Sequence, residues 1–132
     1  MTTLNGISIS TDHANPSDLI WTRSEKRIAR KAFDAALKRE LDAVMQQARQ
    51  MAGQIREPSE LWDLEHYLTQ SRKEINYKYD FRGSRLTHVL GKLVHEGRLQ
   101  EEHLRGISAD KLKAIRSYAA FLARMDATES GI

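Results

Sequence analysis

Between Thr22 and Gln54 the sequence contains no proline, and its single glycine, Gly53, lies at the far end. The stretch opens with the T-x-x-E spacing of a capping box, in which Thr22 and Glu25 satisfy backbone N–H groups of the first turn. We therefore predict one continuous helix over about residues 22–54. Such a helix is about 48 Å long, whereas a compact domain of this size is roughly 36 Å across. The helix must project beyond its own domain.

The long helix carries an apolar seam that alternates steps of four and three residues, as a coiled coil does. A projecting helix leaves such a seam in water unless another chain covers it. The sequence therefore predicts a coiled-coil-like homodimer, antiparallel or crossed, with an isologous helical interface. The alternative is a kink near Gly53 or earlier that folds the helix back within one chain. The residues assigned to the dimer interface are Leu37, Leu41, Val44, Ala48 and Met51.

The rest of the chain predicts further helices and gives no strand signal. Its only prolines are Pro16 and Pro58, and its glycines fall where helices should stop. Pro58 and Ser59 precede a second helix over about residues 59–79. The inner face of this helix is expected to consist of Leu61, Leu64, Leu68, Ile75 and Tyr79.

A compact helical head is expected over about residues 84–125. Ser84 can cap its first helix, Gly97 stands where a left-handed residue would end that helix, and Ser108 can cap the last helix. The predicted fold is therefore all-α, with a long N-terminal helix followed by a compact helical head. A flexible lead over residues 1–20 precedes a single helical domain over residues 21–125, and a frayed tail over residues 126–132 follows.

Composition excludes several classes of function. The chain has 132 residues, of which 40% are hydrophobic and 30% are charged, as in one soluble domain. Without cysteine there is no disulfide framework and no thiolate metal site. No signal peptide is recognisable, and no apolar run approaches the roughly 20 residues that span a bilayer. We expect a cytoplasmic protein with no membrane insertion.

The sequence gives little support for catalysis or for nucleic-acid binding. The net charge is only +3, and the basic residues of positions 21–40 are spread around the helix rather than gathered on one face. His88 and His95 are seven residues apart, about 10 Å along a helix, which is too far for the two to share an ion easily. No H-E-x-x-H motif or phosphate loop is present. We expect no enzyme, no metal and no cofactor.

A polar stripe follows the second helix. Trp62, Glu65, Thr69 and Arg72 succeed one another at i+3, i+4 and i+3, so they share one column. A tryptophan beside an arginine is typical of the anchors of protein–protein interfaces. Two alternatives remain open. Trp62 could fold back to seal the preceding helix, and Arg72 could be an ordinary solvated charge that pairs with Glu65.

Three segments of the chain have a distinctive sequence: RELDAVMQQARQ, LWDLEHYLTQSRKEINYKYDFR and LVHEGRLQEEHL. Through them the chain resembles, from Trp21 to Ile115, the fluorescence recovery protein family of cyanobacteria. The resemblance implies an all-helical homodimer that is not an enzyme. It also implies binding to the C-terminal domain of photoactivated orange carotenoid protein. Members accelerate the return of that protein to its orange resting form, which ends non-photochemical quenching at the phycobilisome.

The resemblance also implies a set of site residues on the second helix and in the head. Trp62 and Arg72 match the family's binding patch, whereas Glu65 followed by His66 reverses the family's order of histidine and acid. In the head, His88 stands where the family has an aromatic residue, Ala114 where it has lysine, and Lys111 is kept. The predicted partner-binding residues are Trp62, Glu65, His66, Thr69, Arg72, His88 and Lys111. The departures leave open an alternative, a dimeric helical scaffold or stress-related binding protein with a different partner.

Overall fold

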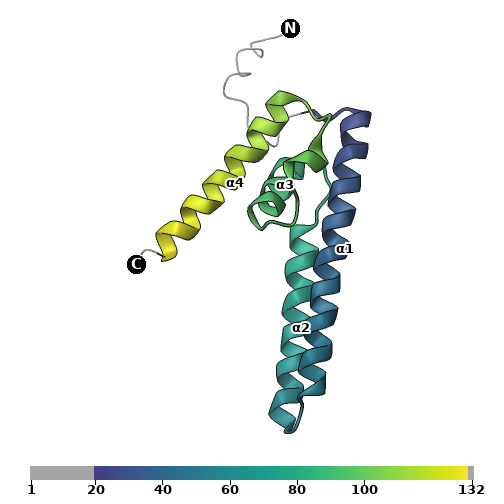
Figure 1. Ribbon diagram of the computed structural model, residues 1–132, viewed down its shortest axis with the longest axis vertical. Helices are drawn as coiled ribbons and strands as arrows, with labels where there is room; N and C mark the ends of the chain where they lie inside the picture. The colour runs from purple at the N-terminus through teal and green to yellow at the C-terminus, as the bar shows by residue number, and fades with distance from the viewer. Residues whose placement is uncertain (1–19, 131–132) are drawn as a thin grey trace.

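The computed structural model describes residues 20–130, which form an all-α fold without strands. Figure 1 shows α1 (Arg23–Gly53) and α2 (Pro58–Lys78) side by side as a long antiparallel hairpin, here called the arm. The head consists of α3 (Leu86–His95), the 3-10 helix η3 (Glu101–Leu104) and α4 (Ala109–Ser130), packed against the first half of α1. The predicted all-α fold is confirmed, and the far end of the arm projects well beyond the head. The predicted lead falls outside the described residues except for Ile20.

The predicted capping box at the start of α1 is confirmed. Thr22 is the N-cap residue, and its hydroxyl accepts a hydrogen bond of 3.1 Å from the backbone N–H of Glu25. In return the Glu25 carboxylate accepts the Thr22 backbone N–H at 3.0 Å. α1 then runs as one continuous helix to Gly53, so it has no kink before Gly53. The alternative is correct in one respect: the chain breaks after Gly53 and folds back on α1 as α2 (Figure 1).

The inner face predicted for α2 is only partly correct. Ile75 is buried, but the side chains of Leu61 and Leu68 are 45% and 43% exposed. The arm is only two helices thick, so no other element among residues 20–130 covers the outer edge of its far half (Figure 1). Helical spacing identifies an apolar column, but it does not say whether a neighbour exists to bury that column.

The seam of α1 meets α2 on one side and water on the other. Val44 faces α2, where it lines a small hollow with Tyr67 and Ile75. Leu41 and Met45 lie on the other side, 43% and 47% exposed. The seam therefore offers a second chain less apolar surface than the sequence suggested, because α2 of the same chain covers part of this surface.

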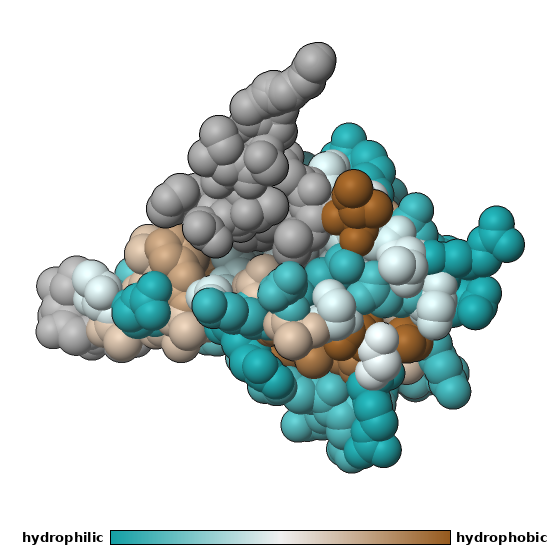
Figure 2. Space-filling view, turned by 90° about the horizontal axis from the view of Figure 1, so that it is seen from above, coloured by the Kyte–Doolittle hydropathy of each residue, from teal (hydrophilic) through white to brown (hydrophobic). Residues whose placement is uncertain are grey.

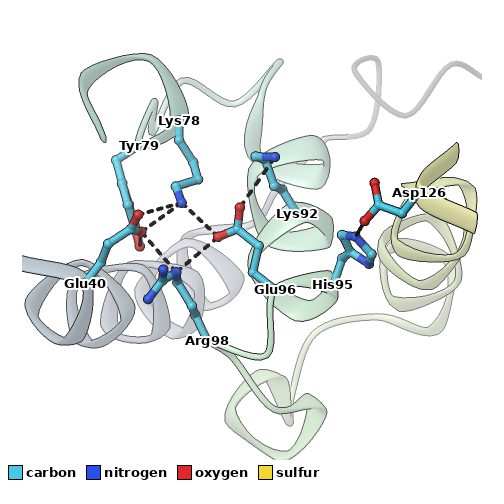
Figure 3. Close-up of polar contacts among 8 residues, drawn as sticks. All are labelled: Glu40, Lys78, Tyr79, Lys92, His95, Glu96, Arg98 and Asp126. Atoms are coloured by element: carbon cyan, nitrogen blue, oxygen red, sulfur yellow. Dashed lines mark hydrogen bonds and ion pairs between the residues drawn. The ribbon is translucent and has the colours of Figure 1, made fainter. Parts of the chain in front are cut away.

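The boundaries of the head helices differ from the predictions in two places. Arg85, not Ser84, is the N-cap residue of α3, and its side chain makes no capping hydrogen bond. α4 continues to Ser130, so residues 126–130 are helical rather than frayed. Asp126 lies 2.7 Å from His95, as Figure 3 shows, and this contact holds the last turns of α4 to α3. Gly97 has the predicted left-handed conformation, with φ of +75°.

The hydrophobic core lies in the head and against the first half of α1. Small alanines at helical spacing, Ala29, Ala32 and Ala36, let the head approach the α1 backbone closely. Phe33 projects between them and meets the rings of Tyr79 and Phe81 edge to face, at centroid distances of 5.1 and 5.2 Å. The other buried apolar members of the core are Trp21, Leu86, Val89, Leu90, Leu93, Leu99, Leu104, Ile107 and Ile115.

A partly buried set of charges, here called the arm–head network, joins the two parts of the molecule (Figure 3). Lys78 at the end of α2 lies 2.8 Å from the carboxylate of Glu40 on α1 and 2.8 Å from that of Glu96 after α3. Arg98 contacts the same two carboxylates, and the Tyr79 hydroxyl donates to Glu40 at 2.8 Å. Burial, followed by the hydrogen bond to Glu40, raises the pKa of Tyr79. The hydroxyl therefore remains a donor.

Close packing of α3 on α4 depends on Gly91. A Cβ at this position would lie 2.9 Å from Cδ2 of Tyr118 and 3.0 Å from the backbone oxygen of Ile115. The second contact is with backbone, which cannot move aside as a flexible side chain can. Any larger residue must therefore push the two helices apart.

We expect Gly91→Ala to lower the free energy of unfolding by about 1 to 3 kcal/mol, because overpacking outweighs the gain in helix propensity. Chemical denaturation followed by circular dichroism measures the change. Gly53→Ala is the matched control: a Cβ there has no heavy atom within 4 Å, so this variant should be as stable as the wild type or more so. Equal stability of Gly91→Ala and wild type would contradict the account of the packing.

Candidate partner-binding face

The polar stripe predicted for α2 is here called the α2 face: Trp62, Glu65 and Arg72 are exposed to solvent, and Thr69 is half-buried. The side chain of Trp62 is 62% exposed, so it does not seal the preceding helix. Thr69 donates a hydrogen bond of 3.1 Å to the Glu65 carboxylate. Arg72 is exposed and has no ion-pair partner among residues 20–130, so it does not pair with Glu65. The structure therefore rules out the sealing role of Trp62 and the pairing of Arg72 with Glu65, while an exposed, unpaired Arg72 is compatible with both a solvated charge and a binding residue.

Apolar side chains border the α2 face. Leu61 and Leu68 precede Glu65 and Arg72 by four residues each, so they share a column with them, and both are substantially exposed. His66 is also exposed, next to Glu65. The face thus combines an aromatic ring, aliphatic side chains and both signs of charge, which is the composition of a protein–protein contact.

The surroundings of the α2 face do not resemble those of a catalytic site. The hollow between the two arm helices has a volume of about 210 Å³ and contains no residue of the α2 face and no histidine. Across residues 20–130, no group of three or more histidines and acids is placed to hold a metal ion. None of the helices in this range combines the length and the apolar character needed to cross a bilayer.

His88, predicted to bind a partner, lies in the head away from the α2 face. Its ring meets that of Tyr118 edge to face at a centroid distance of 4.6 Å, and its Nδ1 is buried without a hydrogen bond among the described residues. Burial, aided by the positive charge of Arg85, lowers the pKa of His88, so the ring is neutral at physiological pH. The structure thus places His88 in the packing of α3 on α4.

Lys111, also predicted to bind a partner, is buried between the first turns of α1 and α4. Its Nζ lies 2.9 Å from the carboxylate of Glu25 and 5.7 Å from the ring centroid of Trp21. The same carboxylate accepts a hydrogen bond of 2.8 Å from the backbone N–H of Ser108. Lys111 therefore fastens the start of α4 to the start of α1, and little of its charge is available to a partner.

The contacts of Glu25 shift its acidity strongly. Burial alone would raise the pKa of Glu25, but hydrogen bonds from Thr22, Lys111 and Ser108 outweigh it and lower the pKa from 4.5 to about 2. A carboxylate with a depressed pKa stabilises the fold above its unfolded-state pKa, and this contribution is lost as the pH falls towards the folded-state value. The relevant window is therefore about pH 4.5 down to pH 2.

We expect the free energy of unfolding to fall by about 2 to 3 kcal/mol across that window through Glu25. Denaturant titrations at a series of pH values measure the fall in the wild type and in Glu25→Gln. The variant should be less stable at pH 7 and should lose most of this acid-dependent slope. Glu102→Gln, which changes an exposed carboxylate, is the control and should keep the wild-type slope. The same slope in Glu25→Gln as in wild type would refute the assignment.

The geometry defines the class of this protein: a helical arm-and-head protein with an exposed tryptophan and arginine in one column of α2. Residues 21–119 match the family described as photoprotection regulator fluorescence recovery protein. The chain belongs to this family.

Relatives of known name and structure agree with this assignment. The chain is 36% identical over 99 residues to the fluorescence recovery protein of Synechocystis sp. PCC 6803, which covers 75% of this chain and 91% of the relative. The solved structure of the Fremyella diplosiphon fluorescence recovery protein superposes with a TM-score of 0.73 at 37% identity, covering 76% of this chain and 99% of that one. The Synechocystis structure gives the same TM-score at 36% identity, with the same coverage of both chains.

Proposed function

We propose that this chain binds the C-terminal domain of photoactivated orange carotenoid protein and accelerates its return to the orange resting form, thereby ending non-photochemical quenching. The observation that carries the proposal is the joint exposure of Trp62 and Arg72 in one column of α2. Membership of a photoprotection regulator family supports it. The proposal includes a cytoplasmic location and an action through binding alone.

Acceleration of the return requires more than affinity. A binding protein shifts an equilibrium only as far as it prefers one state over another, and it speeds a step only by favouring the geometry of that step. α2 is a single helix fixed at its base by the arm–head network, so Trp62 and Arg72 keep a constant separation. A rigid pair of anchors of this kind can hold a partner domain in one orientation.

The reversed order of Glu65 and His66 leaves the essential chemistry of the α2 face in place. Glu65 lies in the column of Trp62 and Arg72, and Thr69 orients its carboxylate with a hydrogen bond. The face therefore presents an aromatic ring, an acid and a base in sequence along one line. His66 adds an exposed imidazole beside that line.

We further propose that the chain forms a homodimer through the arm. Large apolar side chains are exposed along both of its helices: Leu41 and Met45 on α1, Leu61 and Leu68 on α2. A second copy that covered Leu41, Met45 and the exposed edges of Leu37, Val44, Ala48 and Met51 would remove this surface from water. The α2 face would then occur twice in the assembly.

A different partner remains the second candidate function, and one observation favours it. The position at which the family has an aromatic residue is occupied by His88, whose ring is engaged by Tyr118. The head then lacks one aromatic side chain that the family's partner would contact. A helical scaffold that binds a different partner would not need this side chain. Absence of any complex with orange carotenoid protein would favour this second function.

We expect Arg72→Ala to weaken binding to photoactivated orange carotenoid protein by about tenfold or more, since an arginine anchor typically contributes above 1 kcal/mol. Size-exclusion co-elution and titration of the full-length proteins measure the effect. The exposed side chain of Arg72 makes no hydrogen bond or ion pair among residues 20–130, so helicity and stability should change little. Arg49→Ala, an exposed arginine on α1, is the control and should bind as the wild type does. Unaltered binding by Arg72→Ala would remove Arg72 from the site.

We expect Leu41→Glu to yield monomers, because a dimer would have to bury an unpaired carboxylate at this position. In the single chain Leu41 is already 43% exposed, so the fold should tolerate the change. Light scattering coupled to size exclusion at micromolar concentration measures the mass. Ala35→Glu adds the same charge to an exposed position outside the seam and should leave the mass unchanged. A dimer of Leu41→Glu would place the interface elsewhere.

A further inference from the structure

An open pocket of about 350 Å³ lies where the chain leaves α2 and turns towards α3. Here it is called the bend pocket, and its lining residues are Asn76, Tyr77, Asp80, Arg82 and Arg85. Tyr77 is 78% exposed, more than any other large aromatic side chain among the described residues. A tyrosine held in water at the rim of a pocket is a common anchor of protein interfaces.

The bend pocket continues the α2 face. Asn76 follows Arg72 by four residues and therefore extends the column that begins with Trp62. Tyr77 follows the exposed Lys73 by the same spacing. A partner lying along the α2 face towards the head thus reaches the bend pocket next.

The charges of the pocket leave one cation uncommitted. Arg82 is already bound: its Nε lies 3.0 and 2.9 Å from the two oxygens of Asp80. Hydrogen bonds from Arg82 lower the pKa of Asp80, which is therefore an anion. Arg85 has no acidic hydrogen-bond or ion-pair partner among residues 20–130, and its guanidinium stands 6.0 Å from the ring centroid of Tyr77. Two arginines and one aspartate leave a single positive charge.

Arg85 occupies a position where a positive charge is unfavourable for the fold. It is the N-cap residue of α3, at the positive end of the helix dipole, and its side chain makes no capping bond. The positive charge of Arg85 also lowers the pKa of His88, in addition to the larger effect of burial. The Arg85 charge favours the anionic form of Asp80 and stands near the Tyr77 ring, but it makes no ion pair among residues 20–130, so it remains able to bind an anion from a partner.

We propose that the bend pocket is a second anchor of the α2 face and takes one carboxylate side chain, an aspartate or glutamate, of the same partner. The inference rests on the proposed function, because it names that partner. Arg85 would hold the carboxylate through paired N–H donors, and the ring of Tyr77 would pack on the methylene groups of the bound side chain. A phosphate fits less well, since the pocket carries one net positive charge and Asp80 repels a dianion.

A second anchor gives the interface a direction. Trp62 and Tyr77 are 15 positions apart, about 22 Å along α2. One anchor at each end prevents the partner from pivoting about either one. The bend pocket would therefore fix how the carotenoid protein's C-terminal domain lies relative to the head, and not only how tightly it binds.

The test is the affinity of photoactivated, full-length orange carotenoid protein for the wild-type chain and for Tyr77→Ala and Arg85→Asn. Each substitution should weaken binding about five- to tenfold, and the loss should shrink at high salt for Arg85→Asn. Arg85→Asn should at the same time raise Tm by about 1 to 3 °C, because a positive charge is removed from the positive end of the α3 dipole. A purely structural arginine would not combine higher stability with weaker binding.

Lys113→Asn is the control, because it removes one exposed charge from α4, away from the α2 face. It should bind as the wild type does; a loss equal to that of Arg85→Asn would mean general electrostatic attraction and would overturn the inference. If the wild type binds and Tyr77→Ala and Arg85→Asn bind equally well, the bend pocket is not an anchor, although the proposed function stands. If the wild type does not bind, the proposed function fails and the inference fails with it.

Discussion

The ammonium group of Lys78, held between the carboxylates of Glu40 and Glu96, fixes the arm to the head. Each N–O distance is 2.8 Å, and Lys78 is almost fully buried. Buried ion pairs cost desolvation energy that their attraction often only offsets, so the network contributes little net stability. Its effect is geometric. Because Lys78, Glu40 and Glu96 come from three separate segments, their charges are all paired in only one arrangement of those segments (Figure 3).

The outer surface of α2 takes its position from this inner anchor. Lys78 is the last residue of α2, and Tyr77 is its immediate neighbour on the opposite, exposed side. The α2 face extends outward from this point along a single helix, so fixing the base of α2 also fixes Trp62 and Arg72 relative to the head. Apolar side chains are also exposed on the projecting half of α4, where Phe121 and Met125 lie. Pale brown residues are visible at the left of Figure 2, next to the grey end of the chain.

Local patterns predicted most of the helical framework. The Thr22–Glu25 capping box and the left-handed Gly97 each depend on a few consecutive residues, and both are as expected. The α2 face was also predictable, because helical spacing alone brings its residues into one column. Contacts between distant segments were not. The sequence alone suggests that Lys111 lies at the surface, whereas in the fold it pairs with Glu25. The sequence also suggests that the last helix ends early, whereas Asp126 lies in its final turns and pairs with His95. Glu40 follows the buried Ala36 by four residues, so its inward position was a signal of the network that the sequence did contain.

We propose that this member of the family acts on a light-activated partner through the rigid α2 face. The most direct measurement is the rate at which photoactivated orange carotenoid protein returns to its orange form in the dark. It is followed by absorbance with and without a stoichiometric amount of this chain. We expect a faster return with the wild-type chain. An unchanged rate, together with no co-elution of the two proteins, would contradict it and would leave a helical scaffold that serves a different partner.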